Sequence, residues 1–271
     1  MNKKISVGKL TIGNEEKLIL IAGPCVIESE QSALKIAEKI KAIAGEVGIG
    51  YIFKASYDKA NRQSVKSYRG PGIKKGLKIL NKIRKELDIP VLTDVHSPHE
   101  ALMAAEAADI LQVPALLSRQ TDLVLAAAKT MLPVNVKKGQ FLSPWDVKYI
   151  IEKIESVGNK KIMLTERGTV FGYNNLVVDM RSLPVMAAYG YPVIFDVTHS
   201  IQEPGRMGHA SGGKPEYIQC LAKAAVATGI AGIFVEVHPS PEKALSDGAC
   251  MLKLNNLKAL LRDIKNIDEA I

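Results

Sequence analysis

The sequence is poor in three features that each mark a class of protein. Its three cysteines are an odd and sparse set, which offers no disulfide framework and favours a reducing compartment. It has no run of about eighteen apolar residues, so we expect no membrane span. Its start, MNKKISVGKLTIGNEEK, lacks the apolar stretch of a secretory signal. We therefore expect a cytoplasmic protein.

Aromatic residues are also scarce, at 5%, although the formal net charge is +8. A basic chain could bind nucleic acid or an anionic membrane surface. Nucleic-acid binding, however, usually needs aromatic stacking platforms or a long basic tail, and neither is present. The basic residues lie instead in several separated loops. This favours a small anionic substrate, with no nucleic-acid or membrane partner, although solubility alone would explain much of the charge.

Short β-branched runs alternate with longer helical patterns along the chain. The runs expected to form strands are 18–23, 50–54, 90–94, 109–113, 133–137, 161–165, 192–196 and 232–237. Helices are expected from Ser29 onwards and over 73–87, 98–107, 118–131, 143–157, 182–189, 215–228 and 255–267. Such alternation indicates parallel strands joined by helical crossovers.

Eight strand–helix units in 271 residues match a closed (β/α)8 barrel, which we expect to form one domain over 1–271. A doubly wound open sheet is the alternative, but no G-x-G-x-x-G follows the first strand. Before that strand we expect a short hairpin in residues 1–17, with Gly13 and Asn14 as turn-like residues. We also expect Cys220 to lie on the apolar face of its helix, in the core.

One connection is unusually long and basic. The connection between the expected strand 50–54 and the expected helix 73–87 covers residues 54–72, KASYDKANRQSVKSYRGPG. Such connections normally need only a few residues. Its cations stand beside short hydrogen-bonding side chains, a combination suited to phosphate or carboxylate groups. The alternative interpretation is a solvent-exposed basic loop, which is the more common structure for a run of charged residues.

Polar residues follow nearly every expected strand, where (β/α)8 barrels build their active sites. One subset is cationic: Lys54, Lys59, Arg62, Lys137 and Arg167. A second subset could bind a divalent transition metal: Cys25, His199, Glu236 and Asp247. From spacing alone the metal signal is weak, because a lone cysteine is usually a small buried hydrophobe and a lone histidine usually a structural or acid–base residue.

Ten ordered blocks resemble the 3-deoxy-D-manno-octulosonate 8-phosphate synthases over almost the whole chain. They are IAGPCVIES (21–29), FKASYDKANRQS (53–64), SYRGPG (67–72), VLTDVH (91–96), LQVPA (111–115), SRQTDL (118–123), VNVKKGQF (134–141), LTERG (164–168), IFDVTHS (194–200) and EVHPSPEKALSD (236–247). The resemblance implies a homotetrameric barrel whose N-terminal hairpin closes the bottom. It implies condensation of phosphoenolpyruvate with arabinose 5-phosphate, for lipopolysaccharide biosynthesis.

The family's residue roles carry over to matching positions of this chain. Those implied for phosphoenolpyruvate are Lys54, Lys59, Gln112, Ala115, Lys137 and Arg167. Those implied for the sugar phosphate are Asn61, Arg62, Gln63, Ser64, Asp94 and Arg119, with Arg119 donated across a subunit interface. The implied catalytic residues are Lys54, Lys59, His199 and Glu236. The implied metal ligands are Cys25, His199, Glu236 and Asp247.

The resemblance implies zinc or ferrous iron at that site, because the metal-independent class has asparagine where this chain has Cys25. One position departs from the family: KANRQS places Gln63 where a hydroxyl usually contacts the sugar phosphate. The rival 3-deoxy-arabino-heptulosonate 7-phosphate synthases, which use erythrose 4-phosphate, typically have KPRTS in this loop. A non-catalytic binder of anions or nucleic acid is the alternative of another class. The Gly-rich segment 203–214, which contains His209, is expected to be a flexible lid.

Overall fold

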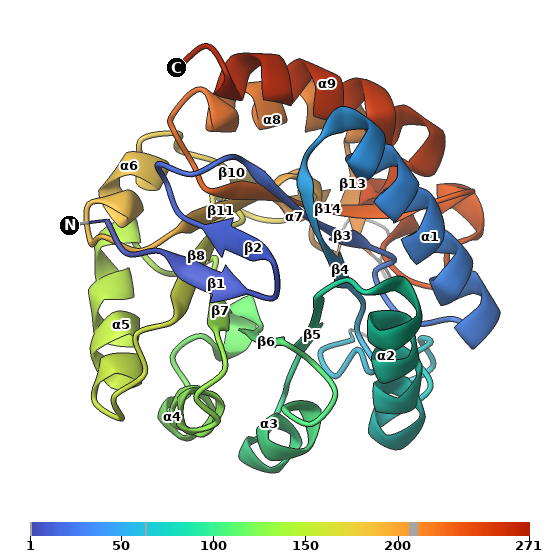
Figure 1. Ribbon diagram of the computed structural model, residues 1–271, viewed down its shortest axis with the longest axis horizontal. Helices are drawn as coiled ribbons and strands as arrows, with labels where there is room; N and C mark the ends of the chain where they lie inside the picture. The colour runs from blue at the N-terminus through green and yellow to red at the C-terminus, as the bar shows by residue number, and fades with distance from the viewer. Residues whose placement is uncertain (1, 63, 206–210) are drawn as a thin grey trace.

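Eight parallel strands close into a barrel surrounded by helices, in a computed structural model that describes residues 2–62, 64–205 and 211–271 (Figure 1). The barrel strands are β3 (Ile19–Gly23), β4 (Gly50–Lys54), β5 (Val91–Asp94), β6 (Ile110–Val113), β7 (Val134–Lys137), β8 (Ile162–Glu166), β11 (Val193–Asp196) and β14 (Gly232–His238). They pair in chain order, and the pairing of β11 with β14 closes the ring. The predicted (β/α)8 fold is confirmed.

Except for the one-turn α7, which continues directly from β11 at the cavity end of the barrel, the helices lie outside the ring, as the crossovers between parallel strands require (Figure 1). They are α1 (Glu30–Val47), α2 (Ile73–Leu87), α3 (Pro98–Ala104), α4 (Thr121–Lys129), α5 (Val147–Glu155), α6 (Ser182–Ala187), α7 (Val197–Ser200), α8 (Ile218–Val226) and α9 (Leu257–Asp268). Helix α1 begins where the sequence predicts, because the Ser29 hydroxyl accepts a hydrogen bond from the Ser32 amide at 3.1 Å.

Period-2 alternation in the strands divides the core into two parts. In β3, Leu20 and Ala22 face outwards and pack with the helices, whereas Ile19 and Ile21 face the barrel interior. The outer cluster is the larger and includes the buried stripes of the helices. The interior cluster fills the half of the barrel nearest the strand starts, so chemistry must lie at the other end.

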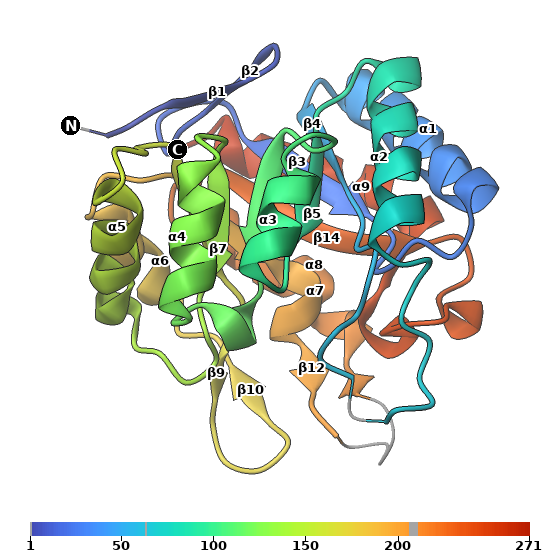
Figure 2. The same cartoon turned by 90° about the horizontal axis from the view of Figure 1, so that it is seen from below.

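An N-terminal hairpin closes the filled end of the barrel (Figure 2). Strands β1 (Ile5–Val7) and β2 (Leu10–Ile12) pair antiparallel, and their apolar side chains join the interior cluster. The predicted hairpin is confirmed, but its turn lies at Gly8 and Lys9. Gly8 has φ 55°, a value that favours glycine.

Gly13 and Asn14 open a turn, as their residue types indicate, since the Glu16 amide donates to the Gly13 carbonyl at 3.1 Å. The Asn14 side-chain amide donates to the Tyr191 carbonyl, and its oxygen accepts from the Val193 amide, both at 2.9 Å. Asn14 thereby satisfies backbone groups at the start of β11 that the sheet leaves unpaired. Asn14 therefore also ties this turn to the barrel.

Short elements missed by the sequence patterns decorate the opposite end (Figure 2). They are β9 (Thr169–Val170), β10 (Leu176–Val177), β12 (Gln202–Glu203), β13 (Gly212–Gly213) and β15 (Leu252–Lys253). The one-turn helix α7 was also missed, because four residues are too few to show a period. The core assignment of Cys220 is wrong: it is exposed, since α8 buries the stripe formed by Ile218, Ala222, Ala225 and Val226.

Within residues 2–62, 64–205 and 211–271, no helix combines the length and apolar character that crossing a membrane requires.

Candidate active site

A cavity of about 1190 Å³ opens at the carboxyl ends of the barrel strands. Five cations reach it from the basic connection after β4 and from the ends of β4, β7 and β8. They are Lys54, Lys59, Arg62, Lys137 and Arg167. All but Arg62 have less than 10% of their surface exposed. Buried cations are costly unless anions compensate them, so each one calls for a partner.

Glu236 is the internal anion for two of the lysines. Its Oε1 lies 3.2 Å from Lys54 Nζ and 4.0 Å from Lys59 Nζ. Burial tends to raise the Glu236 pKa, but His199 and the two lysines outweigh it and lower the pKa to about 2. The pKa of Lys59 rises because Glu236 and other anions outweigh the lowering effect of burial. Both partners are therefore charged at neutral pH.

Lys137 lies in a second compensated pair at the end of β7. Its ammonium contacts Asp196 and stands 3.9 Å from the centre of the Phe234 ring, a cation–π contact. Burial, aided by the charge of Lys54, lowers the Lys137 pKa despite Asp196. The Asp196 pKa is held well below its usual value by His199 and Lys137, which outweigh its burial.

Arg167 retains unused hydrogen-bonding capacity inside the cavity. Its Nη2 donates to Gln202 at 2.9 Å, while the buried Nη1 has no hydrogen-bond partner among the described residues. Burial lowers the Arg167 pKa from its ordinary value. Glu166 accepts from the Arg167 and Gly168 amides and so fixes this turn. An unpartnered guanidinium donor beside other cations suits an anion such as phosphate.

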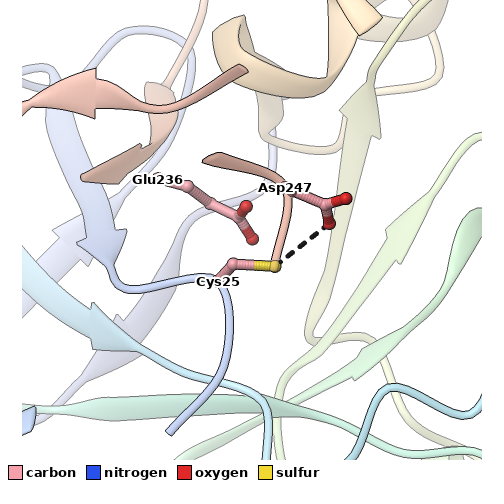
Figure 3. Close-up of side chains that lie close together, drawn as sticks. All are labelled: Cys25, Glu236 and Asp247. Atoms are coloured by element: carbon pink, nitrogen blue, oxygen red, sulfur yellow. Dashed lines mark hydrogen bonds between the residues drawn. The ribbon is translucent and has the colours of Figure 1, made fainter. Parts of the chain in front are cut away.

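The Cys25 thiol and the carboxylates of Glu236 and Asp247 lie close together (Figure 3). One ligand atom from each of Cys25, Glu236 and Asp247 lies within 4.8 Å of the others. The Cys25 thiol donates to Asp247 Oδ2 at 3.1 Å. Asp247 adopts φ 50°, a left-handed conformation that is uncommon outside glycine. Burial raises the Cys25 pKa, and the negative charges of Asp247 and Glu236 raise it further.

His199 approaches the same cluster from helix α7. Its Nδ1 lies 2.7 Å from Asp196 Oδ2, and its Nε2 lies 3.6 Å from Glu236 Oε2. A proton on Nδ1, held by Asp196, leaves the Nε2 lone pair on the side of Glu236. Thiolate, imidazole and carboxylate oxygen form a donor set that fits a transition metal such as zinc.

A polar network also lines the wall beside Lys54. The Ser56 hydroxyl donates to Asp94 Oδ1 at 2.5 Å, and His96 Nε2 lies 3.2 Å from Asp94 Oδ2. Gln112 donates to Asn135 at 2.8 Å, and Asn135 donates to Thr165 at 2.7 Å, which fixes the Gln112 amide at the floor. These contacts leave the polar side chains of the floor with defined orientations.

The structure gathers most of the predicted site residues at this cavity. Those lining it are Lys54, Lys59, Asn61, Arg62, Asp94, Gln112, Ala115, Lys137, Arg167, His199 and Asp247. Cys25 and Glu236 lie in contact with these residues. Ser64 lies in the basic connection, where its hydroxyl accepts from the Lys66 amide at 3.2 Å. Gln63 and His209 lie outside the described residues.

Arg119 lies apart from the others. It lines a second, smaller cavity of about 260 Å³ together with side chains of α5. Its predicted contact with substrate therefore requires another chain and stays a prediction.

Ser246 and His96 are among the contributors that escaped the sequence prediction. Ser246 lies 2.9 Å from Cys25 Sγ, and its hydroxyl also accepts from Arg62. A serine in a loop carries no signal that could have indicated this contact. His96 stood at a strand end, which marked it as polar, but its partner Glu100 lies in the next helix.

A (β/α)8 barrel whose strand ends carry buried cations and a thiol–carboxylate cluster defines an enzyme-type site for small anionic substrates. The sequence model of the DAHP synthetase I family matches residues 2–271, and the chain belongs to that family.

Curated relatives match over the full length. The chain is 56% identical to the 2-dehydro-3-deoxyphosphooctonate aldolase of Geotalea daltonii over 271 residues, 100% of each chain. Identity is 55% to the protein of that name from Geobacter sulfurreducens and 56% to that from Geotalea uraniireducens, each again covering 100% of both chains.

The unpartnered Arg167 donor predicts that the cavity binds inorganic phosphate. Replacing Arg167 with Gln should weaken phosphate binding about 10- to 100-fold, because a charge-assisted hydrogen bond contributes about 1.5–3 kcal/mol. Isothermal titration calorimetry measures the change. The control is Arg181→Gln, on an exposed arginine paired with Asp179, which should bind phosphate like the unmodified protein. Equal affinity for all three proteins would contradict this reading of Arg167.

Proposed function

We propose that the protein condenses phosphoenolpyruvate with D-arabinose 5-phosphate and water to give 3-deoxy-D-manno-octulosonate 8-phosphate and inorganic phosphate. The observation that carries the proposal is the cavity, where buried cations and a thiol–carboxylate cluster meet across Glu236. Full-length identity of 55–56% to proteins named 2-dehydro-3-deoxyphosphooctonate aldolase supports the choice of reaction.

Phosphoenolpyruvate is assigned to the deep cationic side of the cavity. Lys137 and Arg167 take its phosphate, for which the unpartnered Arg167 donor is available. Lys54 and Lys59 hold its remaining charge, and Gln112 with the Ala115 backbone completes its surroundings. Their burial favours this assignment, because an anion that enters here offsets the cost of keeping the cations away from water.

The sugar phosphate is assigned to the outer part of the cavity. Asn61 and Arg62, with Gln63 and Ser64, contact its phosphate, while Asp94 faces the sugar hydroxyls. Arg62 lies between the outer part of the cavity and the thiol–carboxylate cluster, since its Nη1 is 3.5 Å from Asp247 Oδ1. Arg119 is assigned to the sugar phosphate of a neighbouring subunit, which fits its position at a separate, smaller cavity of this chain.

The proposed reaction begins with two anions held close and aligned, which supplies much of the rate. The C3 carbon of phosphoenolpyruvate attacks the sugar aldehyde, and the aldehyde oxygen takes up a proton. Positive charge develops at C2, where water adds and gives up a proton. The resulting tetrahedral intermediate releases phosphate by C–O cleavage. His199 and Glu236 are assigned to move these protons, and Lys54 and Lys59 to balance the charge.

A divalent metal, zinc or ferrous iron, is assigned to Cys25, His199, Glu236 and Asp247. The ion would supply Lewis acidity, either polarising the aldehyde or lowering the pKa of water. The clustering of ligand atoms within 4.8 Å supports the assignment for Cys25, Glu236 and Asp247. Asp196 would orient His199 from behind, as outer carboxylates commonly do for metal-bound histidines.

The reaction is tested by measuring phosphate release from phosphoenolpyruvate with either sugar phosphate. We expect rapid release with arabinose 5-phosphate and little with erythrose 4-phosphate. The reverse preference would establish the heptulosonate 7-phosphate synthase, which remains relevant because the matched family is described as DAHP synthetase. Tight oligonucleotide binding without phosphate release would favour a non-catalytic anion binder.

The metal assignment predicts that Cys25→Ser lowers bound metal and activity together. Losing the thiolate should reduce metal affinity at least about tenfold, because soft thiolate ligands favour transition metals. Elemental analysis of the purified protein measures metal content independently of activity. Cys220→Ser is the matched control, since Cys220 is exposed. A Cys25→Ser protein that retained full metal content as purified would rule the assignment out. So would full activity of that protein after exhaustive chelation.

A homotetramer is also proposed, supported by exposed aromatic side chains near the β9–β10 hairpin. Phe171 is 70% exposed and Tyr173 fully exposed. Large exposed apolar side chains in one region commonly mark a protein interface. Light scattering should give about four times the 29.4 kDa chain mass. Replacing Phe171 and Tyr173 with Asp should lower that mass, whereas Ile271→Asp, at the other end of the barrel, should not. A monomeric unmodified protein would end this proposal.

We place the reaction in the cytoplasm, as a step that supplies lipopolysaccharide synthesis. Three free cysteines, two of them buried, are consistent with a reducing compartment. Recovery of the protein in the periplasmic fraction of cells would contradict this location.

A further inference from the structure

The cavity wall carries a histidine to which the proposed reaction gives no task. His96 follows strand β5 by two residues and lines the cavity. Its side chain is 11% exposed, so most of the ring is held by protein atoms. Such a histidine needs hydrogen-bond partners for its ring nitrogens.

Both ring nitrogens of His96 face carboxylate oxygens. Nε2 lies 3.2 Å from Asp94 Oδ2, and Nδ1 lies 3.1 Å from Glu100 Oε2. A neutral imidazole has one N–H, so its other nitrogen would turn a lone pair towards a carboxylate. A doubly protonated ring donates to both oxygens. The contacts therefore favour the charged form of the ring.

Glu100 is itself fixed by its surroundings. The same Oε2 atom accepts from the His96 amide at 2.9 Å and from the Tyr57 hydroxyl at 2.8 Å. The Glu100 amide donates to the hydroxyl of Ser97, the N-cap of α3, at 3.3 Å. Because the helix start holds its backbone and three groups meet at one oxygen, Glu100 has little freedom to turn away from the ring.

Tyr57 couples this arrangement to the basic connection that follows β4. Its side chain is fully buried, and its ring meets the His96 ring edge-on, with centroids 5.7 Å apart. A Cβ atom at Gly76 would lie 2.2 Å from Tyr57 Cβ, so helix α2 packs tightly against the tyrosine. The phenol therefore reaches Glu100 from a rigid base.

We propose that Glu100 and Tyr57 are positioning residues for His96 on the cavity wall: Glu100 holds the ring as an imidazolium, whose charge faces the substrate anions, and Tyr57 fixes Glu100 in place. The proposal rests on the proposed function for the nature of those anions. The charge state of the ring can be measured without any substrate.

The electrostatic surroundings agree with a charged ring. Burial alone lowers the His96 pKa, but the hydrogen bond to Asp94 and the charges of Asp94 and Glu100 outweigh it, so the pKa is raised. Asp94, Glu100 and Tyr57 face the ring directly, and Lys54 and Lys59 lie beyond Asp94. Since the folded pKa is raised, the ring stabilises the fold below its ordinary value of about 6.5 and loses that contribution as pH rises through the folded value.

The test is a ¹⁵N-histidine NMR titration of the full-length protein, with His96 identified among the five histidines from the spectrum of His96→Gln. Glu100→Gln keeps a hydrogen-bond acceptor but removes the charge. It should lower the His96 pKa by about 1 pH unit or more, as expected for losing a carboxylate in contact. Glu106→Gln, an equal charge change on an exposed residue just beyond α3, should leave that pKa unchanged.

Kinetics then separate the roles of Glu100 and Tyr57. In Glu100→Gln, the alkaline limb of kcat/KM for phosphate release should move to lower pH along with the His96 pKa. Tyr57→Phe keeps both charges, so the ring should stay protonated and the pH profile unchanged, while KM rises by at most about tenfold, the full value of one hydrogen bond, because Glu100 then holds the ring less firmly. A Tyr57→Phe protein with a neutral His96 would overturn this division of roles.

A neutral His96 in the unmodified protein at pH 7, or a His96 pKa that Glu100→Gln does not change, overturns the proposal even if phosphate release is normal. Absence of phosphate release with either sugar, alongside a charged ring, would instead overturn the proposed function.

Discussion

The contact between Glu236 and its cations is the interaction on which the site depends. This buried carboxylate lies 3.2 Å from Lys54 and 4.0 Å from Lys59, and His199 approaches its other oxygen at 3.6 Å. Removing such a charge would take away the nearest carboxylate of the buried Lys54 ammonium, and breaking a buried ion pair typically costs about 3–5 kcal/mol. Glu236 also belongs to the cluster with Cys25 and Asp247. One side chain therefore joins the anion-binding and metal-binding parts of the cavity.

The barrel brings these residues together through strand register. Strand β14 pairs with β3 so that Glu236 lies beside Gly23, two residues before Cys25. At Gly23 a Cβ atom would lie 2.0 Å from the Lys54 carbonyl oxygen, so only glycine permits this approach of β3 and β4. Lys54 thus ends its strand next to the Cys25 segment. The distances at Glu236 follow from backbone pairing and from one residue without a side chain.

Sequence patterns predicted the parts of the structure that repeat. Strand β4 and helix α2 occur at their predicted residues because period-2 and period-3.6 patterns are strong there. The rule that active sites of (β/α)8 barrels lie at strand ends identified Lys54, Lys137 and Glu236 as site residues from the strand positions alone. No local pattern indicated the pairing of β11 with β14; the closed ring was predicted only from the number of strand–helix units.

Several of the misses share a physical cause, which is contact between residues distant in sequence. Asn14 lies in a turn, as expected, but its side chain also contacts Tyr191 and Val193, some 180 positions away. Ser246 became part of the site through Arg62 and Cys25, neither of which is near it in the chain. Local patterns carry no information about such partners.

The N-terminal hairpin has a consequence for the order of events. Because its apolar side chains fill one end of the barrel, the cavity has its opening at the opposite end. In a cavity that opens at one end, a molecule on the floor near Lys137 must enter before one that covers it, and must leave after it. The two hairpin strands, far from the chemistry, would thereby determine the order in which ligands bind and leave.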